Sequence, residues 1–249
     1  MAPASSLVAA FVVLAPLFAD GRALRQERGD PRTLLVIGAH MFGKDENDAD
    51  YQKWKSQTWG RTILVEANPF VYRDLAAAAT TFPASFGKVE VYNWGVMSRA
   101  AHGFIREENK CPSFYHVNRT YLANHPELPH QYDQIGSFRI SHVLKHIPKR
   151  LHDGDPYFVA QSKIECRLLP EILEELRPAT LKLDTEGLDC DLIKAVPCRT
   201  WQLAHVSSIV FEWKHCPTVA ARAIWQVVRC KFEIASFGEE DVHMTRVEG

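Results

Sequence analysis

The stretch Thr180-Leu-Lys-Leu-Asp-Thr-Glu-Gly-Leu-Asp189 is an apolar segment that ends in two carboxylates and a glycine. Its apolar part predicts a buried β-strand, and in open α/β sheets ligands bind in the crevice outside the carboxyl ends of the strands. We therefore expect Asp184 and Glu186 to lie at a binding site. The alternative is that the strand stops and a helix begins, because acidic residues also favour the first turn of a helix.

The segments around this strand alternate between apolar runs and amphipathic stretches. Apolar runs rich in β-forming residues predict strands, here at residues 33–37, 62–66, 89–92, 180–184, 206–212, 232–237 and 242–247. Helices are expected at residues 51–59, 69–80, 188–196 and 219–228, with a turn at Gly95. Alternating strands and helices predict a Rossmann-like α/β fold, with a mainly parallel sheet flanked by helices.

Size and charge limit the functional classes. The chain has 249 residues, 46% of them hydrophobic and 24% charged, which is enough for one large α/β domain with a buried core over residues 32–249. Its formal net charge of -1 argues against nucleic acid as a partner, because binding to the phosphate backbone requires a basic surface.

Residues 111–155 interrupt the alternation. This segment is rich in His, Pro, Tyr and Asn and is long for a connection, so it is interpreted as an insert that covers the substrate, with decoration of a sheet edge as the alternative. Within it a helix is expected over residues 141–147, with Ser141 as its N-cap. Basic residues follow at roughly helical spacing and are interpreted as a solvated face, or alternatively as an anion site: His142, Lys145, His146, Lys149, Arg150 and His152.

Three features of the sequence concern the compartment of the protein. The apolar run of residues 7–19 predicts a signal peptide or N-terminal anchor within residues 1–23, which would bring the protein close to a membrane. Six cysteines without a CxxC pair permit disulfides, and Asn118-Arg-Thr120 is a glycosylation sequon. These features favour the secretory pathway or the extracellular space, with the cytoplasm as the alternative.

The tips of the expected strands indicate the kind of ligand. Gly38 follows the first strand, Glu66 ends the second, and Asp184 and Glu186 end the fourth. A glycine allows close approach to the backbone, and an acid after the second strand can accept both ribose hydroxyls. No GxGxxG loop is present to hold a pyrophosphate, so the pattern favours a nucleoside over a dinucleotide and indicates S-adenosylmethionine.

Six segments have a recognisable order and spacing. They are Leu35-Val-Ile-Gly-Ala-His40, Leu64-Val-Glu-Ala-Asn-Pro69, Gln134-Ile-Gly-Ser-Phe138, Ile164-Glu-Cys-Arg-Leu-Leu-Pro-Glu-Ile-Leu173, Leu181-Lys-Leu-Asp-Thr-Glu-Gly187 and Ile209-Val-Phe-Glu212. Together they resemble the FkbM-type family of class I S-adenosylmethionine-dependent methyltransferases. The resemblance covers about residues 33–245 and implies a class I methyltransferase fold with an antiparallel closing strand. It also implies methylation of an oxygen on a sugar or another small hydroxylated metabolite.

The resemblance also implies roles for particular residues. Those expected to bind S-adenosylmethionine are Gly38, Ala39 and Gly43 at the methionine part, Glu66 and Asn68 at the ribose, Asn93 and Trp94 near adenine, and Asp184 at the amino group or the sulfonium. Asp184 and Glu186 are the candidate catalytic residues. A carboxylate is a weak base towards an alcohol, so Glu186 is expected mainly to position the acceptor hydroxyl. His215 is an alternative base, or a structural histidine.

The chain departs from the family pattern at two positions. Val36 stands where the family has an acid, and His40 stands where it has an asparagine. These departures keep open the alternative of a catalytically silent binding protein, while a nucleotide-dependent Rossmann-fold enzyme is disfavoured by the missing glycine loop. No metal site is predicted, because Asp184, Glu186 and Glu212 have no diagnostic ligand spacing. The sequence leaves the oligomeric state open.

Overall fold

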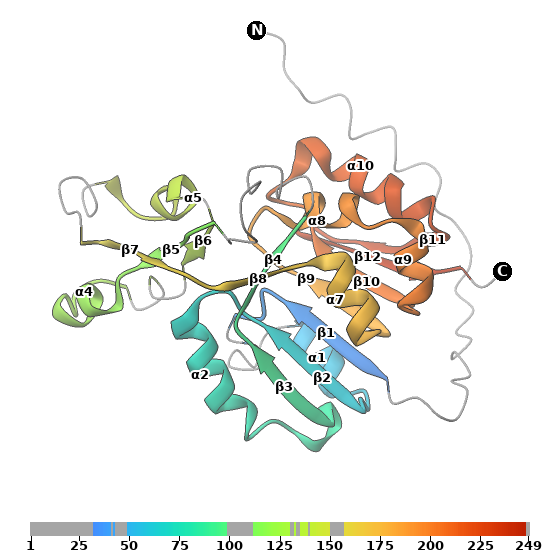
Figure 1. Cartoon of the computed structure of the whole chain (residues 1–249), viewed down its shortest axis with the longest axis horizontal. Helices are drawn as coiled ribbons and strands as arrows, with labels where there is room; N and C mark the ends of the chain where they lie inside the picture. Colours follow the sequence, from blue (N-terminus) through green and yellow to red (C-terminus); the bar gives the residue numbers. More distant parts are fainter. Residues whose placement is uncertain are drawn as a thin grey trace, which may run out of the picture. The chain divides into compact units, whose positions relative to one another are not determined.

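Seven strands form the central sheet, in the order β11-β12-β10-β9-β1-β2-β3 (Figure 1). Their bounds are β1 Thr33–Ile37, β2 Arg61–Val65, β3 Lys88–Tyr92, β9 Thr180–Leu183, β10 Ser208–Glu212, β11 Phe232–Phe237 and β12 Asp241–Arg246. The pairs β1–β2, β1–β9, β2–β3 and β9–β10 are parallel, whereas β12 runs antiparallel to both β10 and β11. The predicted mainly parallel, Rossmann-like α/β sheet is confirmed.

This computed structural model describes residues 32–40, 42, 49–98, 112–129, 132, 135–138, 140–149 and 157–247, all within one unit, Pro31–Gly249. The predicted signal peptide or anchor at residues 1–23 lies outside the described residues. Within the described part of the chain, no helix is long and apolar enough to cross a membrane.

Alternate residues of the central strands enter two cores on opposite faces of the sheet. In β1, Leu35 and Ile37 belong to one buried cluster and Leu34 and Val36 to the other, as expected when successive side chains point to opposite faces. Helices that pack on the first face are α7 Leu169–Leu176, α8 Asp189–Ala195, α9 Cys198–Leu203 and α10 Pro217–Val228. Helices α1 Ala49–Lys55 and α2 Pro69–Ala79 contribute to the second, with a short 3-10 turn, η2 Ala84–Phe86.

The described residues between 112 and 162 build a smaller sheet beside the central one (Figure 1). Strands β5 Phe114–Val117, β6 Gly136–Ser137 and β7 Val159–Ser162 form an antiparallel sheet with β5 in the centre, accompanied by α4 Arg119–Asn124 and α5 Ile140–Lys145. They share a separate buried cluster that includes Val143 and Phe158. Because β7 pairs with β5, this structure extends past residue 155, where the insert was expected to end.

Three local predictions differ from the structure. Helix α1 ends at Lys55, not at residue 59, and the indole of Trp59 turns back to donate to the carbonyl of Trp54 at 3.0 Å. Gly95 was expected in a turn, but it lies in strand β4 Trp94–Met97, which pairs in parallel with β8 Glu165–Leu168. Helix α5 begins at Ile140, so Ser141 lies inside the helix and is not its N-cap.

Disulfides link the helices on one face of the sheet. Cys190 of α8 is bonded to Cys216, and Cys198 of α9 is bonded to Cys230. Cys166 is disulfide-bonded as well.

The sequon residue Asn118 caps α4 by accepting from Thr120 N at 3.0 Å, and its amide nitrogen donates to the carbonyl of Tyr157 at 2.9 Å. This hydrogen bond uses one of the two N–H donors of the amide, and glycosylation at Asn118 stays a prediction.

Candidate functional site

A cavity of about 450 Å³ lies at the carboxyl ends of the parallel strands. Gly38, Glu66 and Asp184 each follow the last residue of a strand, β1, β2 and β9 respectively, and all three line this cavity. The remainder of the wall comes from β4, from the loop before α8 and from the small sheet with α5. Its volume lies within the range of ordinary small-molecule sites.

Glu66 is held rigidly in the cavity wall. One carboxylate oxygen accepts from the backbone N–H of His40 at 2.8 Å, and the other accepts from the N–H of Asn68 at 2.7 Å. The residue is only 8% exposed. Burial raises the pKa of Glu66 to about 7, although the two backbone donors favour the charged form. The carboxyl group therefore titrates close to neutral pH.

Gly38 is required by the approach of β1 to β9. Its φ is 75°, a conformation that glycine adopts without strain. A Cβ added here would lie 1.8 Å from the carbonyl oxygen of Asp184. The glycine was expected to make room for a ligand, and the structure shows that it also makes room for the neighbouring strand end.

The two asparagines predicted near the cofactor hold the loop after β2. Asn68 is buried and caps α2, where its side-chain oxygen accepts from Phe70 N at 3.1 Å, and it also lines the cavity. The side-chain amide of Asn93 donates to the carbonyls of Glu66 at 2.8 Å and Ala67 at 3.0 Å. Among the described residues Asn93 is not part of the cavity lining, so it acts on the site through this loop.

Trp94 lies in the cavity wall, whereas two other predicted residues do not. Its ring stacks on Tyr92 with centroids 4.1 Å apart, and the Arg167 guanidinium lies 4.6 Å from the ring centroid. Ala39 is buried in the core on the α1 face and, among described residues, is not in the cavity lining. Gly43 lies outside the described residues.

Asp189 shapes the loop that carries the two catalytic candidates. Its carboxylate is fully buried and accepts from Thr185 N at 2.9 Å and Gly187 N at 3.2 Å. Burial raises the pKa of Asp189 to about 6, with a smaller contribution from Asp184. Glu186 occupies the left-handed region with φ 55°, which is unusual for a residue other than glycine. The loop thereby directs Glu186 into the cavity wall.

Asp184 and Glu186 face different partners. Asp184 lies 3.6 Å from Lys182 Nζ, while Glu186 Oε2 lies 3.2 Å from His215 Nδ1. The same His215 nitrogen lies 3.0 Å from Glu212 Oε2. Burial, together with the neighbouring carboxylates of Asp184 and Glu186, raises the pKa of Glu212 to about 8. His215, considered either a base or a structural histidine, therefore bridges two carboxylates beside the cavity.

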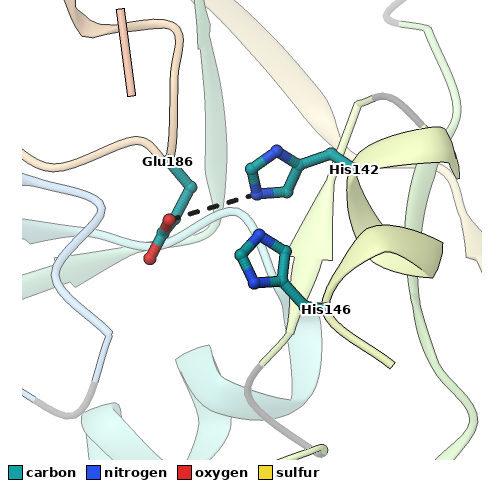
Figure 2. A group of neighbouring side chains, drawn as sticks. All are labelled: His142, His146 and Glu186. Carbon is teal, nitrogen blue, oxygen red and sulfur yellow. Dashed lines mark ion pairs between the residues drawn. The ribbon is translucent and has the colours of Figure 1, made fainter. Parts of the chain in front are cut away.

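Two histidines of α5 complete the polar side of the cavity. His142 and His146 line it together with Glu186, and Figure 2 shows their rings directed toward that carboxylate. The predicted solvated face is confirmed for His146, Lys145 and Lys149, which are exposed, whereas His142 is only partly exposed. Arg150 and His152 lie outside the described residues. The signal for the histidines was their spacing of four residues, but their contact with Glu186 depends on tertiary structure.

The site combines an apolar wall with separated polar groups. Val65, Val96 and Phe114 supply apolar lining. Glu66 lies at the end of β2, and Glu186 lies with His142 and His146 near the end of β9.

Searches against protein-family models, curated proteins and solved structures find no significant match for the chain. The chemistry of the cavity is therefore the basis for a functional assignment.

Proposed function

We propose that the protein is an S-adenosylmethionine-dependent methyltransferase that methylates a hydroxyl oxygen of a small molecule, such as a sugar. The observation that carries the proposal is Glu66, a rigidly held carboxylate at the tip of β2, in the wall of a cavity that Gly38 and Asp184 also line. A carboxylate at this strand end is suited to accept the two hydroxyls of a ribose.

The sheet supports the same proposal. The resemblance to FkbM-type methyltransferases implies a parallel sheet with an antiparallel closing strand, and β12 runs antiparallel between β10 and β11. The chain has no glycine-rich phosphate loop after β1, which disfavours a dinucleotide. A nucleoside with an amino-acid tail is the ligand that this set of strand ends fits best.

The residues present fit such a cofactor. Each Glu66 oxygen already accepts one backbone N–H and keeps a further acceptor position, because a carboxylate oxygen has two lone pairs. Trp94 offers an aromatic wall, and Asp184 offers a negative charge for the amino group or the sulfonium. Val36 stands where the family has an acid, and it is buried in the core on the α1 face. Having valine in place of the acid at this position therefore removes no group from the described cavity lining.

The acceptor side is assigned to Glu186 and His215. When bound, S-adenosylmethionine supplies an electrophilic methyl group on a positively charged sulfur. Glu186 orients the acceptor hydroxyl, and the proton that this hydroxyl loses as its oxygen–carbon bond forms passes to the Glu186 carboxylate, which His215 Nδ1 holds at 3.2 Å. Holding the acceptor in line with the methyl group supplies much of the rate.

Isothermal titration calorimetry with S-adenosylmethionine tests the proposal. We expect micromolar binding, about 7 to 8 kcal/mol, that weakens at least about tenfold in Glu66→Ala. Glu171→Ala is the matched control, because Glu171 is exposed on α7 and is expected to leave the affinity unchanged. Absence of binding by the wild type would refute the proposal. Binding without turnover on a panel of sugars and other small alcohols would favour a catalytically silent protein.

We also propose that the protein works in an oxidising compartment, the secretory pathway or the extracellular space. The support is the set of disulfides, Cys190–Cys216 and Cys198–Cys230 together with the bonded Cys166. Disulfides persist in such compartments and are rare in the cytosol.

A further inference from the structure

The small sheet and the central sheet meet at a cluster of metal-binding side chains. His142 and His146 lie on α5, and Glu186 lies in the loop between β9 and α8. One ligand atom from each of the three lies within 4.8 Å of the others. From this geometry we infer that His142, His146 and Glu186 form a binding site for a divalent transition-metal ion of the zinc type. The inference goes beyond methyl transfer and does not depend on it.

The helix prepares two of the ligands. Residues four apart on a helix lie on the same face, and the rings of His142 and His146 have centroids 4.6 Å apart. A pair of histidines at this spacing on one helix face is a known zinc-binding arrangement. The sequence alone did not indicate the site because the third ligand comes from a separate segment of the chain.

Small side-chain movements would bring the ligands to bonding distance. Glu186 Oε2 lies 4.0 Å from His142 Nε2, the interaction drawn in Figure 2. Zinc binds nitrogen and carboxylate oxygen at about 2.0 to 2.2 Å, so two ligand atoms of a tetrahedral ion lie about 3.4 Å apart. His142 and Glu186 therefore need to approach by less than about 1 Å, which a rotation of the exposed Glu186 side chain provides.

The ligand types select the class of ion. Two imidazoles with one carboxylate suit zinc and its first-row neighbours, whereas calcium and magnesium prefer sites made of oxygen atoms.

Glu186 lies between the histidines of α5 and a third histidine, His215. His215 Nδ1 lies 3.2 Å from Glu186 Oε2 and 3.0 Å from Glu212 Oε2, so it orients Glu186 as an outer-shell partner. Glu186, Glu212 and His215 also approach one another closely enough to offer further ligands.

The ion would face the cavity. All three proposed ligands belong to the cavity lining, and three protein ligands leave an open coordination position for an oxygen of water or of a bound molecule. If the methyltransferase proposal holds, this open position lies on the acceptor side and would bind the acceptor hydroxyl. Because the ligands come from α5 and from the loop after β9, the ion would also fasten the small sheet to the central one.

The test uses Co²⁺, which binds the same ligands as zinc and absorbs visible light when bound. The full chain is treated with EDTA, the chelator is removed, and the protein is titrated with Co²⁺ and then with Zn²⁺ as a competitor. We expect one equivalent of Co²⁺ to give visible absorption that Zn²⁺ abolishes. Zinc is also expected to raise the thermal unfolding midpoint, because binding to the folded state stabilises it.

Two variants identify the ligands. His146→Ala and Glu186→Gln are each expected to weaken Co²⁺ binding at least about tenfold. His125→Ala is the matched control, since His125 stacks on Tyr121 and pairs with Glu127 away from the cavity. His146 is exposed, so its variant is expected to unfold at the same temperature as the wild type in EDTA.

Several outcomes would overturn the inference. Absence of Co²⁺ absorption in the wild type is one, and unchanged affinity in both ligand variants is another. Calorimetry with S-adenosylmethionine in EDTA separates the two proposals. Binding of Co²⁺ without binding of S-adenosylmethionine would support the metal site and reject the methyltransferase proposal. Binding of S-adenosylmethionine without binding of Co²⁺ would reject only the metal site.

Discussion

Glu66 is subject to two opposing influences. Its burial disfavours the charged carboxylate, and its two backbone N–H donors, from His40 and Asn68, favour it. The first influence is the larger, so the pKa of Glu66 rises to about 7. The group that is assigned to the ribose is thus also a source of pH-dependent stability.

Replacing Glu66 by Gln removes this titration. The folded pKa of about 7 lies above the ordinary value of 4.5, so the stabilisation linked to the proton is complete below about pH 4.5 and is lost as the pH rises through 7. The free energy of unfolding of the wild type, minus that of Glu66→Gln, should therefore fall by about 3 kcal/mol between pH 4.5 and 8. Urea unfolding at several pH values in EDTA measures it. Parallel pH profiles for the two proteins would contradict the assigned pKa.

The loop from β9 to α8 depends on one buried carboxylate. Asp189 accepts the N–H groups of Thr185 and Gly187 and so fixes the conformation of the segment that holds Asp184 and Glu186. A residue in the first turn of α8 thus shapes the site. The alternative interpretation of this stretch was that its acidic residues mark the start of a helix. That interpretation describes the position of Asp189.

Asp189→Ala should loosen this loop without disturbing the sheet. The Thr185 and Gly187 amides lose their acceptors, and the loss of one hydrogen bond worth about 1.4 kcal/mol accelerates hydrogen exchange about tenfold. Exchange measured by NMR or mass spectrometry is expected to rise at these amides and to stay unchanged in β1. Asp191→Ala is the control, because Asp191 lies in the same turn but pairs with Lys194 at 2.7 Å. Equal exchange in the two variants would show that Asp189 does not hold the loop.

The sequence predicted those elements whose signals are local. The apolar runs of β1, β2 and β9, and the proline start of α2, lie within one residue of the observed bounds, because burial on both faces and helix capping both act within a few residues. Gly95 was misassigned because β4 pairs with β8, far away in the chain, and no local pattern records that pairing. The same limit applies to the site, where His142 and His146 could be listed as a helical pair but not set beside Glu186.

The disulfides fasten the helices on one face of the central sheet to one another. Cys190 and Cys198 lie in α8 and α9, and their partners Cys216 and Cys230 flank α10. The bonds therefore close loops of 26 and 32 residues in the C-terminal half of the chain. Such loops restrict the unfolded chain, and the α8–α10 face should lose stability when they are opened.

The double variant Cys198→Ser/Cys230→Ser tests both the bond and the compartment. Opening a loop of 32 residues is expected to lower the free energy of unfolding by about 4 kcal/mol, measured by urea unfolding without reductant. Adding reductant should lower the stability of the wild type more than that of the double variant, because the wild type has one more bond to lose. Protein made in an oxidising compartment should show no thiol reactive to a thiol reagent after denaturation. Free thiols in that material, or equal stability of wild type and double variant, would reject the bond and with it the argument for a secretory location.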